Sequence, residues 1–474
     1  MKNKKGLRVF ATALMVAMLT GSIVGCGNQK EVVEIEDMEP VESPAISFDV
    51  IGGKDVMPLF GYHGPSVLDW SQDGIALPEM INEEVYKMIA DCGINLISYS
   101  FTDQNNAPDI VKQMMDMAHA NGMGTFVYDS AISNAYGENS SSVDKLATHL
   151  SEYINHPGFA GVYLIDEPGT HKYNIANGHY VSDYPELYDQ LVRQIGVPTY
   201  FNLLPLTDMD KKDDYIAYVE EYLTTVKPTY LCYDKYPFEV ENQGKEDVYF
   251  WNLGLMRDYA REYNIPLWTF MQCGDQWYLT KDTEKYWPTE GQYDWHVNAN
   301  LAFGVQGIQY HTLLEYINSA WAETEMFDSY RSGLIGILGN KNQWWYYTQE
   351  INKHIAAIDH VLMNSVNVGV IASGEKANWA TRLCSDKTMI EGTAWRELEN
   401  VEGEALVGCF NYQGKTALYV VNYSTEYAQN IKLSFVDKYD VTVFQNAEAS
   451  YYNADSLTLN MPAGDGVLIV FEDK

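Results

Sequence analysis

Short apolar segments alternate with longer amphipathic segments through the middle of the chain. Eight of the apolar segments have the length of strands, and the segments between them repeat apolar residues at helical spacing. Such alternation predicts parallel strand–helix–strand units. The predicted strands are Met57–Tyr62, Ile94–Phe101, Gly124–Asp129, Ala160–Glu167, Thr199–Leu204, Thr229–Asp234, Pro266–Gln272 and Gly307–Leu313.

Several predicted helices end at a glycine or asparagine just before the next strand, and these residues tolerate the left-handed conformation that terminates a helix. The eight units predict an α/β fold, a (β/α)8 or TIM barrel, over residues 48–365. A doubly wound sheet is the alternative, but no dinucleotide-type glycine-rich loop follows the first strand. The predicted helices are Asn82–Cys92, Ala107–Asn121, Val143–Ile154, Pro185–Ile195, Asp213–Val226, Val248–Tyr263, Tyr293–Phe303 and a closing helix, Gln343–Met363.

Residues 366–474 follow another pattern, in which apolar and polar residues alternate over short stretches separated by turn residues. This pattern predicts a small C-terminal antiparallel β-sandwich or half-barrel. The predicted strands are Val368–Ala372, Leu406–Tyr412, Ala417–Asn422, Asn430–Ser434, Asp440–Phe444, Ser456–Met461 and Gly466–Phe471.

The first residues predict the location of the protein. A basic start is followed by an apolar run, Val9–Val24, and then by Gly25-Cys26. This order is typical of a bacterial secretion signal over residues 1–25, and its end resembles the lipobox of lipoproteins, in which Cys26 is lipidated. Residues 26–47 are acidic and lack apolar periodicity, as expected of a tether. We therefore expect a membrane partner, reached through a lipid anchor on the extracellular face. The alternative is a spanning helix, for which the run is short.

Composition narrows the choice of partners. The formal net charge is −34, which argues against nucleic-acid binding, because that function requires a basic surface. The chain contains 36 tyrosines and 11 tryptophans, and aromatic rings with a polar end match the apolar faces and polar rims of sugars. Five cysteines remain besides Cys26, and none has CxxC or zinc-finger spacing. One disulfide among them is possible, although buried thiols are expected.

The carboxyl ends of the barrel strands are where a (β/α)8 barrel places its active site. The residues expected there are polar, and we take them as candidates for binding or catalysis. The sequence has no His-x-His pair and no serine elbow, and no phosphate-binding loop follows the last two strands, so neither a metal nor a cofactor is expected. The candidates are Tyr62, His63, Tyr128, Asp129, Asp166, Glu167, Asn202, Asp234, Tyr236, Gln272, Tyr310 and His311.

Three acidic residues among these candidates suit acid/base chemistry on a glycosidic bond. That chemistry needs two carboxyl groups that flank the bond, and one of them must keep its proton near neutral pH. Asp166 adjoins Glu167, and Asp234 follows a later strand, so the three carboxyls can be coupled electrostatically. Because the fourth and sixth strands are not neighbours in a barrel, we expect a wide separation of Glu167 and Asp234, which favours inversion.

The segment Gly161-Val-Tyr-Leu-Ile-Asp-Glu-Pro168 resembles the fourth strand of clan A glycoside hydrolases, in which the motif is usually Asn-Glu-Pro. On that resemblance Glu167 is the acid/base residue. The segment Gly333–Ile355 is similar to the closing stretch of the barrel in beta-galactosidase-like members, in which a β-domain also commonly follows. The resemblance covers residues 57–474 in layout and implies a hydrolase of O-glycosidic bonds with a carbohydrate substrate.

The sequence departs from that family at two positions. Asp166 stands where asparagine is usual, and Gln272 stands where the seventh strand usually ends in a nucleophilic glutamate. Three explanations remain open. Asp234 is the second carboxylate, Asp166 or Asp275 fills that role, or the protein binds glycans without cleaving them. A barrel hydrolase that acts on a non-sugar substrate is a further alternative.

Overall fold

The computed structural model of the chain describes residues 46–65, 71–72, 75–76, 79–98, 108–128, 143–173, 178–238, 242, 244–274, 288–314, 333–336 and 338–472. Pro40–Lys474 forms one compact unit. The signal peptide, Cys26 and the tether are predictions that lie outside the described residues, apart from the last two residues of the tether. Within the described part of the chain, no helix is long and apolar enough to cross a membrane.

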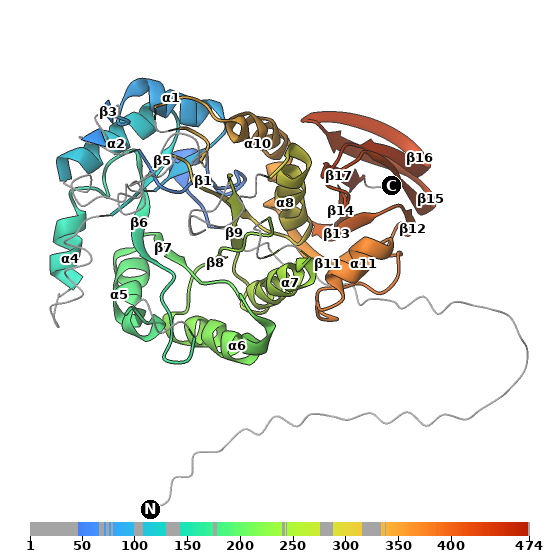
Figure 1. Cartoon of the computed structure of the whole chain (residues 1–474), viewed down its shortest axis with the longest axis horizontal. Helices are drawn as coiled ribbons and strands as arrows, with labels where there is room; N and C mark the ends of the chain where they lie inside the picture. Colours follow the sequence, from blue (N-terminus) through green and yellow to red (C-terminus); the bar gives the residue numbers. More distant parts are fainter. Residues whose placement is uncertain are drawn as a thin grey trace, which may run out of the picture. The chain divides into compact units, whose positions relative to one another are not determined.

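Eight parallel strands form the barrel (Figure 1), in the order β7-β6-β5-β4-β1-β10-β9-β8. The ring closes between β7 and β8 through one bridge, Leu203 to Tyr233, with Leu203 N–H donating to the carbonyl of Cys232 at 3.0 Å. All eight predicted strands are confirmed at their cores. They are β1 Leu59–Gly61, β4 Leu96–Ile97, β5 Gly124–Val127, β6 Phe159–Asp166, β7 Thr199–Asn202, β8 Leu231–Tyr233, β9 Leu267–Gln272 and β10 Gly307–His311.

The predicted helices are present, and several begin or end at a residue that caps them. The Asn82 side chain accepts from Val85 N–H, and Thr289 forms a capping box with Gln292. Gly196 adopts a φ of 85° where the helix after β6 ends. Two helices finish in π-helical turns, Gln190–Ile195 and Tyr222–Val226. The α-helices are α1 Glu83–Asp91, α2 Pro108–Ala120, α4 Val143–Leu150, α5 Pro185–Asp189, α6 Lys212–Glu221, α7 Glu246–Glu262, α8 Glu290–Ala302 and α10 Gln343–Leu362.

Aromatic rings fill the interior of the barrel. The Phe60 ring stacks on Tyr200 with centroids 5.5 Å apart, and Tyr200 stacks on Tyr163 at 4.7 Å. Phe48 packs at the opposite end of the barrel against Trp268, at 5.9 Å. Because the interior is a packed core, only the polar residues above these rings can meet a ligand.

The C-terminal region is the predicted antiparallel β-domain, a sheet in the order β11-β13-β14-β17-β15-β12 with β16 paired to β15. Two of its predicted strands, Asn430–Ser434 and Asp440–Phe444, are one continuous strand with an irregularity between Ser434 and Tyr439. β12 and a short helix, α11 Glu375–Thr381, were not predicted from the sequence. The strands are β11 Ser365–Ser373, β12 Leu398–Glu402, β13 Ala405–Tyr412, β14 Lys415–Asn422, β15 Gln429–Gln445, β16 Glu448–Met461 and β17 Gly466–Phe471.

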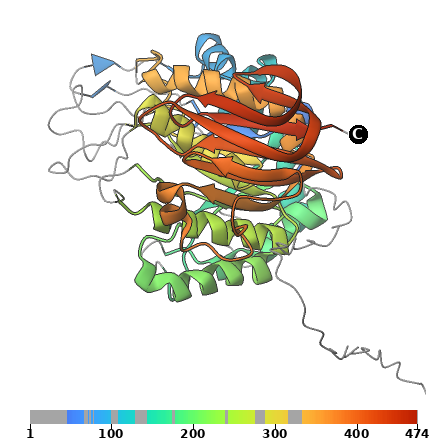
Figure 2. The same ribbon diagram turned by 90° about the vertical axis from the view of Figure 1, so that its right-hand side faces the viewer.

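The β-domain packs closely on the helices of the barrel (Figure 2). Asn298 of α8 donates to the carbonyl of Gly464 at 2.9 Å and accepts from the Tyr419 hydroxyl at 2.7 Å. A Cβ atom on Gly408 would lie 2.2 Å from the carbonyl oxygen of Ala302, so the approach requires glycine there.

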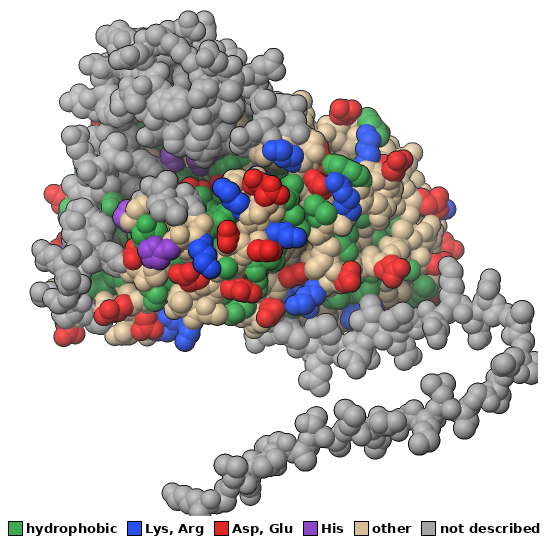
Figure 3. Space-filling model, turned by 60° about the horizontal axis from the view of Figure 1, so that its bottom comes forward, with side chains coloured by type: hydrophobic (Ala, Val, Ile, Leu, Met, Phe, Trp, Pro, Cys, Tyr) green, Lys and Arg blue, Asp and Glu red, His purple; other side chains and the backbone are tan. Residues whose placement is uncertain are grey.

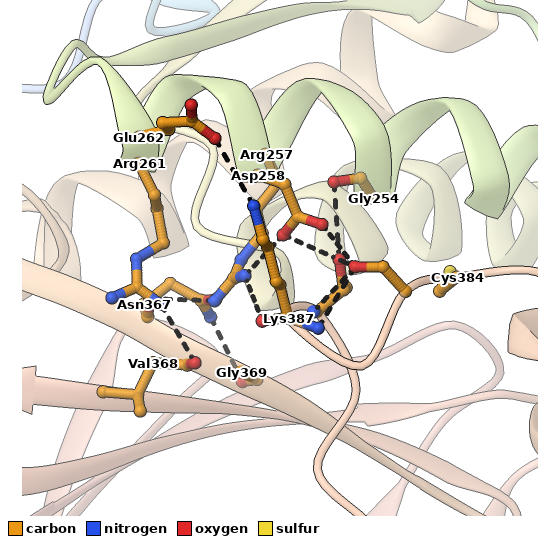
Figure 4. Close-up of polar contacts among 12 residues, drawn as sticks. Gly254, Arg257, Asp258, Arg261, Glu262, Asn367, Val368, Gly369, Cys384 and Lys387 are labelled. Atoms are coloured by element: carbon orange, nitrogen blue, oxygen red, sulfur yellow. Dashed lines mark hydrogen bonds and ion pairs between the residues drawn. The ribbon is translucent and has the colours of Figure 1, made fainter. Parts of the chain in front are cut away.

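A buried arginine also connects α7 to the β-domain (Figure 4). Arg257 donates from Nε to the Asn367 side chain at 3.0 Å and from Nη2 to the Asn367 carbonyl at 3.1 Å. Its Nη1 group donates to the carbonyl of Lys387 at 2.6 Å and to Asp258 at 2.8 Å. The guanidinium thereby satisfies backbone and side-chain acceptors of both regions.

The described surface carries mixed charge. On the face drawn in Figure 3, basic and acidic side chains intermingle. The five cysteines other than Cys26 are free thiols, so the disulfide that the sequence left open is not present among them.

Candidate active site

Three carboxyl groups meet at the carboxyl ends of β6 and β8, and we call Asp166, Glu167 and Asp234 the carboxylate cluster. Asp166 is the last residue of β6 and accepts from the Tyr62 hydroxyl at 2.7 Å and from Asn202 Nδ2 at 2.9 Å. The same Asn202 nitrogen donates to Asp234 at 3.2 Å. One amide therefore bridges two of the carboxylates.

Glu167 contacts the same cluster through a hydrogen bond with Asp234. We expected a wide separation of these two residues, because their strands are not neighbours. The two carboxyl groups are instead within hydrogen-bond reach of each other, although β7 lies between their strands.

The backbone of Glu167 is held in an uncommon conformation. Its φ of 49° lies in the left-handed region, which non-glycine residues seldom adopt. The amide of Glu167 donates to the carbonyl of Asn202 at 3.0 Å, and this bond fixes the chain just before Pro168. Strained backbone of this kind concentrates at functional sites.

Burial and like charges place the proton of the cluster on Glu167. Burial raises the pKa of Glu167 well above its ordinary value, and the charges of Asp234 and Asp166 raise it further. Burial raises the pKa of Asp234 and Asp166 as well. Hydrogen bonds oppose that rise, from Tyr62 and Asn202 at Asp166, and from Glu167 and Asn202 at Asp234. The charge of Asp166 also raises the pKa of Asp234, which reaches about 7, whereas that of Glu167 is raised to about 11. The arrangement therefore favours Glu167 over Asp234 as the group that keeps its proton.

Two histidines and a tyrosine lie beside the cluster. The ring of Tyr62 is 4.6 Å from His63 and 5.8 Å from His311, and Tyr236 is 5.6 Å from His311. Burial lowers the pKa of His311 to about 4. Burial also lowers the pKa of His63, and His311 lowers it further. Both imidazoles are therefore neutral at pH 7, so they can donate or accept hydrogen bonds without adding charge.

Gln272 ends β9 but faces the backbone of the loop after β8. Its Oε1 accepts from Phe238 N–H at 3.2 Å, and its Nε2 donates to the carbonyls of Phe238 at 3.0 Å and Gly274 at 3.2 Å. A glutamate could not make these donations when ionised. The amide at this position therefore anchors the loop through hydrogen bonds to backbone groups.

The remaining candidates differ in where they lie. Tyr310 points to the outer layer of the barrel, where its hydroxyl donates to Asn352 of α10, so the structure does not bring it to the carboxylate cluster. Tyr128 lies near the interior, with its ring 6.3 Å from Tyr163. Asp129 and Asp275 lie outside the described residues.

Two residues of the site were not selected from the sequence. The hydroxyl of Tyr163 lies 2.7 Å from that of Tyr62, and the thiol of Cys232 donates to Asn202 at 3.1 Å. Cys232 lies two residues before Asp234, so alternation along β8 would have found it. Tyr163 lies three residues before Asp166, and the register shift between Tyr163 and Ile165 breaks the alternation on β6.

No group of His, Cys, Asp and Glu side chains in the described part of the chain is arranged to hold a metal ion. The chemistry available among these residues is proton transfer and hydrogen bonding by carboxyl, amide and phenol groups.

No protein-family model matches the sequence, and a search of curated proteins finds no match. Solved structures match in fold. A beta-galactosidase from Rahnella sp. R3 aligns with 91% of this chain and 100% of its own chain, with a TM-score of 0.55 and 11% sequence identity.

Beta-glucuronidases from Ruminococcus gnavus and Lactobacillus rhamnosus each align with 62% of this chain and 49% of their own chains. Their TM-scores are 0.41, at 13% and 15% identity. The chain spans about half the length of these beta-glucuronidases. A (β/α)8 barrel followed by a β-domain is therefore the fold that this chain shares with a glycoside hydrolase, the beta-galactosidase.

Proposed function

We propose that the protein is a glycoside hydrolase that cleaves O-glycosidic bonds of an oligo- or polysaccharide at the carboxylate cluster. The observation that carries the proposal is the hydrogen-bonded pair of Glu167 and Asp234, in which burial and negative neighbours raise the pKa of Glu167. A carboxyl that keeps its proton near pH 7 is the group that a general acid requires.

In this proposal Glu167 donates its proton to the leaving glycosidic oxygen. The oxygen takes the place of Asp234 as acceptor of the Glu167 hydrogen bond, so substrate entry separates the two carboxyls. Asp234 then either attacks the anomeric carbon or removes a proton from an attacking water. The first course leaves about 5 Å between the carboxyls and retains configuration, whereas the second needs about 6.5–9.5 Å and inverts it.

Asp166 has a supporting role in this scheme. Hydrogen bonds from Tyr62 and Asn202 stabilise its ionised form, and its charge helps to keep the proton on Glu167. His63, His311 and Tyr236 offer neutral hydrogen-bonding groups and ring faces for the sugar. Tyr128, whose ring lies 6.3 Å from that of Tyr163, offers a further ring face for the sugar.

We also propose that the enzyme acts at the cell surface. The basic start, the apolar run and Gly25-Cys26 support a cleaved signal and a lipid on Cys26. Radiolabelled palmitate incorporation in a bacterial host, compared between the native chain and Cys26→Ser, tests this part independently of catalysis.

The test of activity is a panel of aryl glycosides and glycans, scored by release of reducing sugar. Glu167→Gln is expected to lower turnover by about 10²–10⁴-fold, the contribution usual for general acid catalysis, while glycan binding persists. Glu350→Gln, which changes an exposed glutamate of α10, is the matched control. Equal turnover of Glu167→Gln and Glu350→Gln would refute the assignment, and the anomeric configuration of the first product would identify the mechanism.

A second candidate function, glycan binding without cleavage, is favoured by one observation. Gln272 stands at the position of the usual strand-seven nucleophile, and its amide is used in anchoring the Phe238 loop. Binding of a glycan without turnover, in both native protein and Glu167→Gln, would support this candidate over the first.

A further inference from the structure

Cys232 lies inside the barrel on β8, between the side chains of Gln309 and Asn202. Its Sγ atom accepts from Gln309 Nε2 at 2.8 Å and donates to Asn202 Oδ1 at 3.1 Å. The exposed fractions of Cys232, Gln309 and Asn202 are 0%, 0% and 1%. The thiol is therefore a buried link in a line of hydrogen bonds that runs from β10 through β8 to β7.

The orientation of the Asn202 amide decides whether its NH2 group or its oxygen faces the carboxylate cluster. In the observed orientation, Nδ2 donates to Asp166 and Asp234, and Oδ1 faces the thiol. Rotation of the amide by 180° would direct Oδ1 at two carboxylate oxygens, which accept hydrogen bonds but cannot donate them when ionised. The NH2 group would then face the thiol proton.

On the side that faces the barrel interior, a donor next to Oδ1 favours the observed orientation of the amide over the rotated one, and the Cys232 thiol is that donor. Burial raises the pKa of Cys232 well above its ordinary value, so the thiol keeps the proton that it donates. Gln309 supports that role because it donates to the sulfur and leaves the S–H free to point at Asn202.

We infer that Cys232 is a positioning residue, whose thiol fixes the Asn202 amide with its NH2 group toward Asp166 and Asp234. The two donated hydrogen bonds then hold the carboxyls in place and oppose the rise of their pKa values that burial causes, while Glu167 keeps its proton. The consequence for catalysis rests on the function proposed above, whereas the orienting contact itself does not.

Three variants separate the donor from the volume of the side chain. Cys232→Val fills similar space without a donor, and Cys232→Ser keeps a donor. Cys409→Val is the matched control, because Cys409 is equally buried but lies in the β-domain. Thermal unfolding of each variant confirms that it folds, and Cys232→Ala replaces the valine variant if that variant does not.

We expect Cys232→Val to lower kcat by about 10–100-fold, by analogy with the loss of residues that hydrogen-bond to metal ligands, with KM changed less than about threefold. Loss of donated hydrogen bonds raises the pKa of a carboxyl, so the acidic limb of the pH–rate profile moves to higher pH. Cys232→Ser is expected to recover most of the lost turnover, and Cys409→Val to match the native protein. Equal losses in Cys232→Val and Cys232→Ser would overturn the inference.

A second readout does not depend on activity. Infrared titration of the carboxyl C=O band follows protonation of the carboxylate cluster in the protein without substrate. The inference predicts a shift to higher pH in Cys232→Val and none in Cys232→Ser or Cys409→Val. Superimposable titrations in all four proteins would overturn it. If the native protein cleaves no glycan, the hydrolase proposal fails by itself, and this titration alone decides the role of Cys232.

Discussion

Two clusters of buried charge in this molecule are built in opposite ways. Between α7 and the β-domain, Arg257 meets Asp258 and backbone carbonyls, so each charge has a partner of opposite sign or polarity. At the carboxyl ends of β6 and β8, three acidic groups crowd together instead, and the charges that raise the pKa of Glu167 are those of Asp166 and Asp234. Both clusters are buried, but only the first pairs charges of opposite sign.

The difference teaches how a structural cluster can be told from a functional one. Opposite charges with complete hydrogen bonding hold two regions together, and removal of one partner leaves the other buried and unpaired. Like charges raise the free energy of the ionised state and move pKa values toward those that acid/base catalysis needs. We therefore expect substitutions in the first cluster to affect stability, and substitutions in the second to affect proton binding.

The largest expected effect on stability is that of Arg257→Ala. It leaves Asp258 and the carbonyls of Asn367 and Lys387 without their donor, which should lower the free energy of unfolding by about 3–5 kcal/mol. Denaturant unfolding measures the loss. Lys432→Ala is the control, because the Lys432–Glu402 pair is exposed and should contribute about 0–1 kcal/mol. A loss as small as that of Lys432→Ala would show that the Arg257 cluster does not hold the regions together.

An intermediate effect is expected for Gln272→Glu, which places a carboxylate against the carbonyls of Phe238 and Gly274. The free energy of unfolding should fall by about 1–3 kcal/mol, the cost of leaving buried groups unsatisfied, and the fall should be larger at pH 8 than at pH 4.5, where the new acid is partly protonated. Gln349→Glu is the control, since that amide donates to Asp91 in an exposed setting. Equal stability of the two variants would contradict the anchoring role of Gln272.

The smallest expected effect is a change in the slope of Tm against pH. The folded protein keeps a proton on Glu167 at pH values at which the unfolded chain has released it, so this group makes stability fall as pH rises. Glu167→Gln removes that proton binding. Between pH 5 and 8 its Tm should therefore decline less steeply than that of the native protein, by about 1–3 °C per pH unit. Parallel curves would mean that Glu167 is ionised in the folded state.

The fold was largely predictable because its local signals agree with its tertiary arrangement. Eight buried strands alternate with helices, several of which end at a glycine or asparagine, and this order predicts a parallel barrel. The β-domain was less predictable. The continuous β15 carries exposed residues around Val436, and these interrupt the apolar alternation without ending the strand.

The candidate site was predictable at the level of strand ends. That rule selected Asp166, Glu167, Asn202 and Asp234, which the structure brings together. It also selected Tyr310, which points outward because successive residues of a strand face opposite sides and His311 faces inward. The contact between Glu167 and Asp234 was not predictable, because it depends on the left-handed backbone of Glu167, which the sequence Asp-Glu-Pro does not reveal.

The join between β7 and β8 has a mechanical consequence. These two strands are joined by one bridge, between Leu203 and Tyr233. Asn202 directly precedes Leu203, and Asp234 directly follows Tyr233. The hydrogen bond between their side chains therefore helps to hold β7 and β8 together. A ligand that moves Asp234 away from Asn202 would break this hydrogen bond and weaken the contact between β7 and β8. Hydrogen exchange of the Leu203 amide should therefore become faster when the site is occupied.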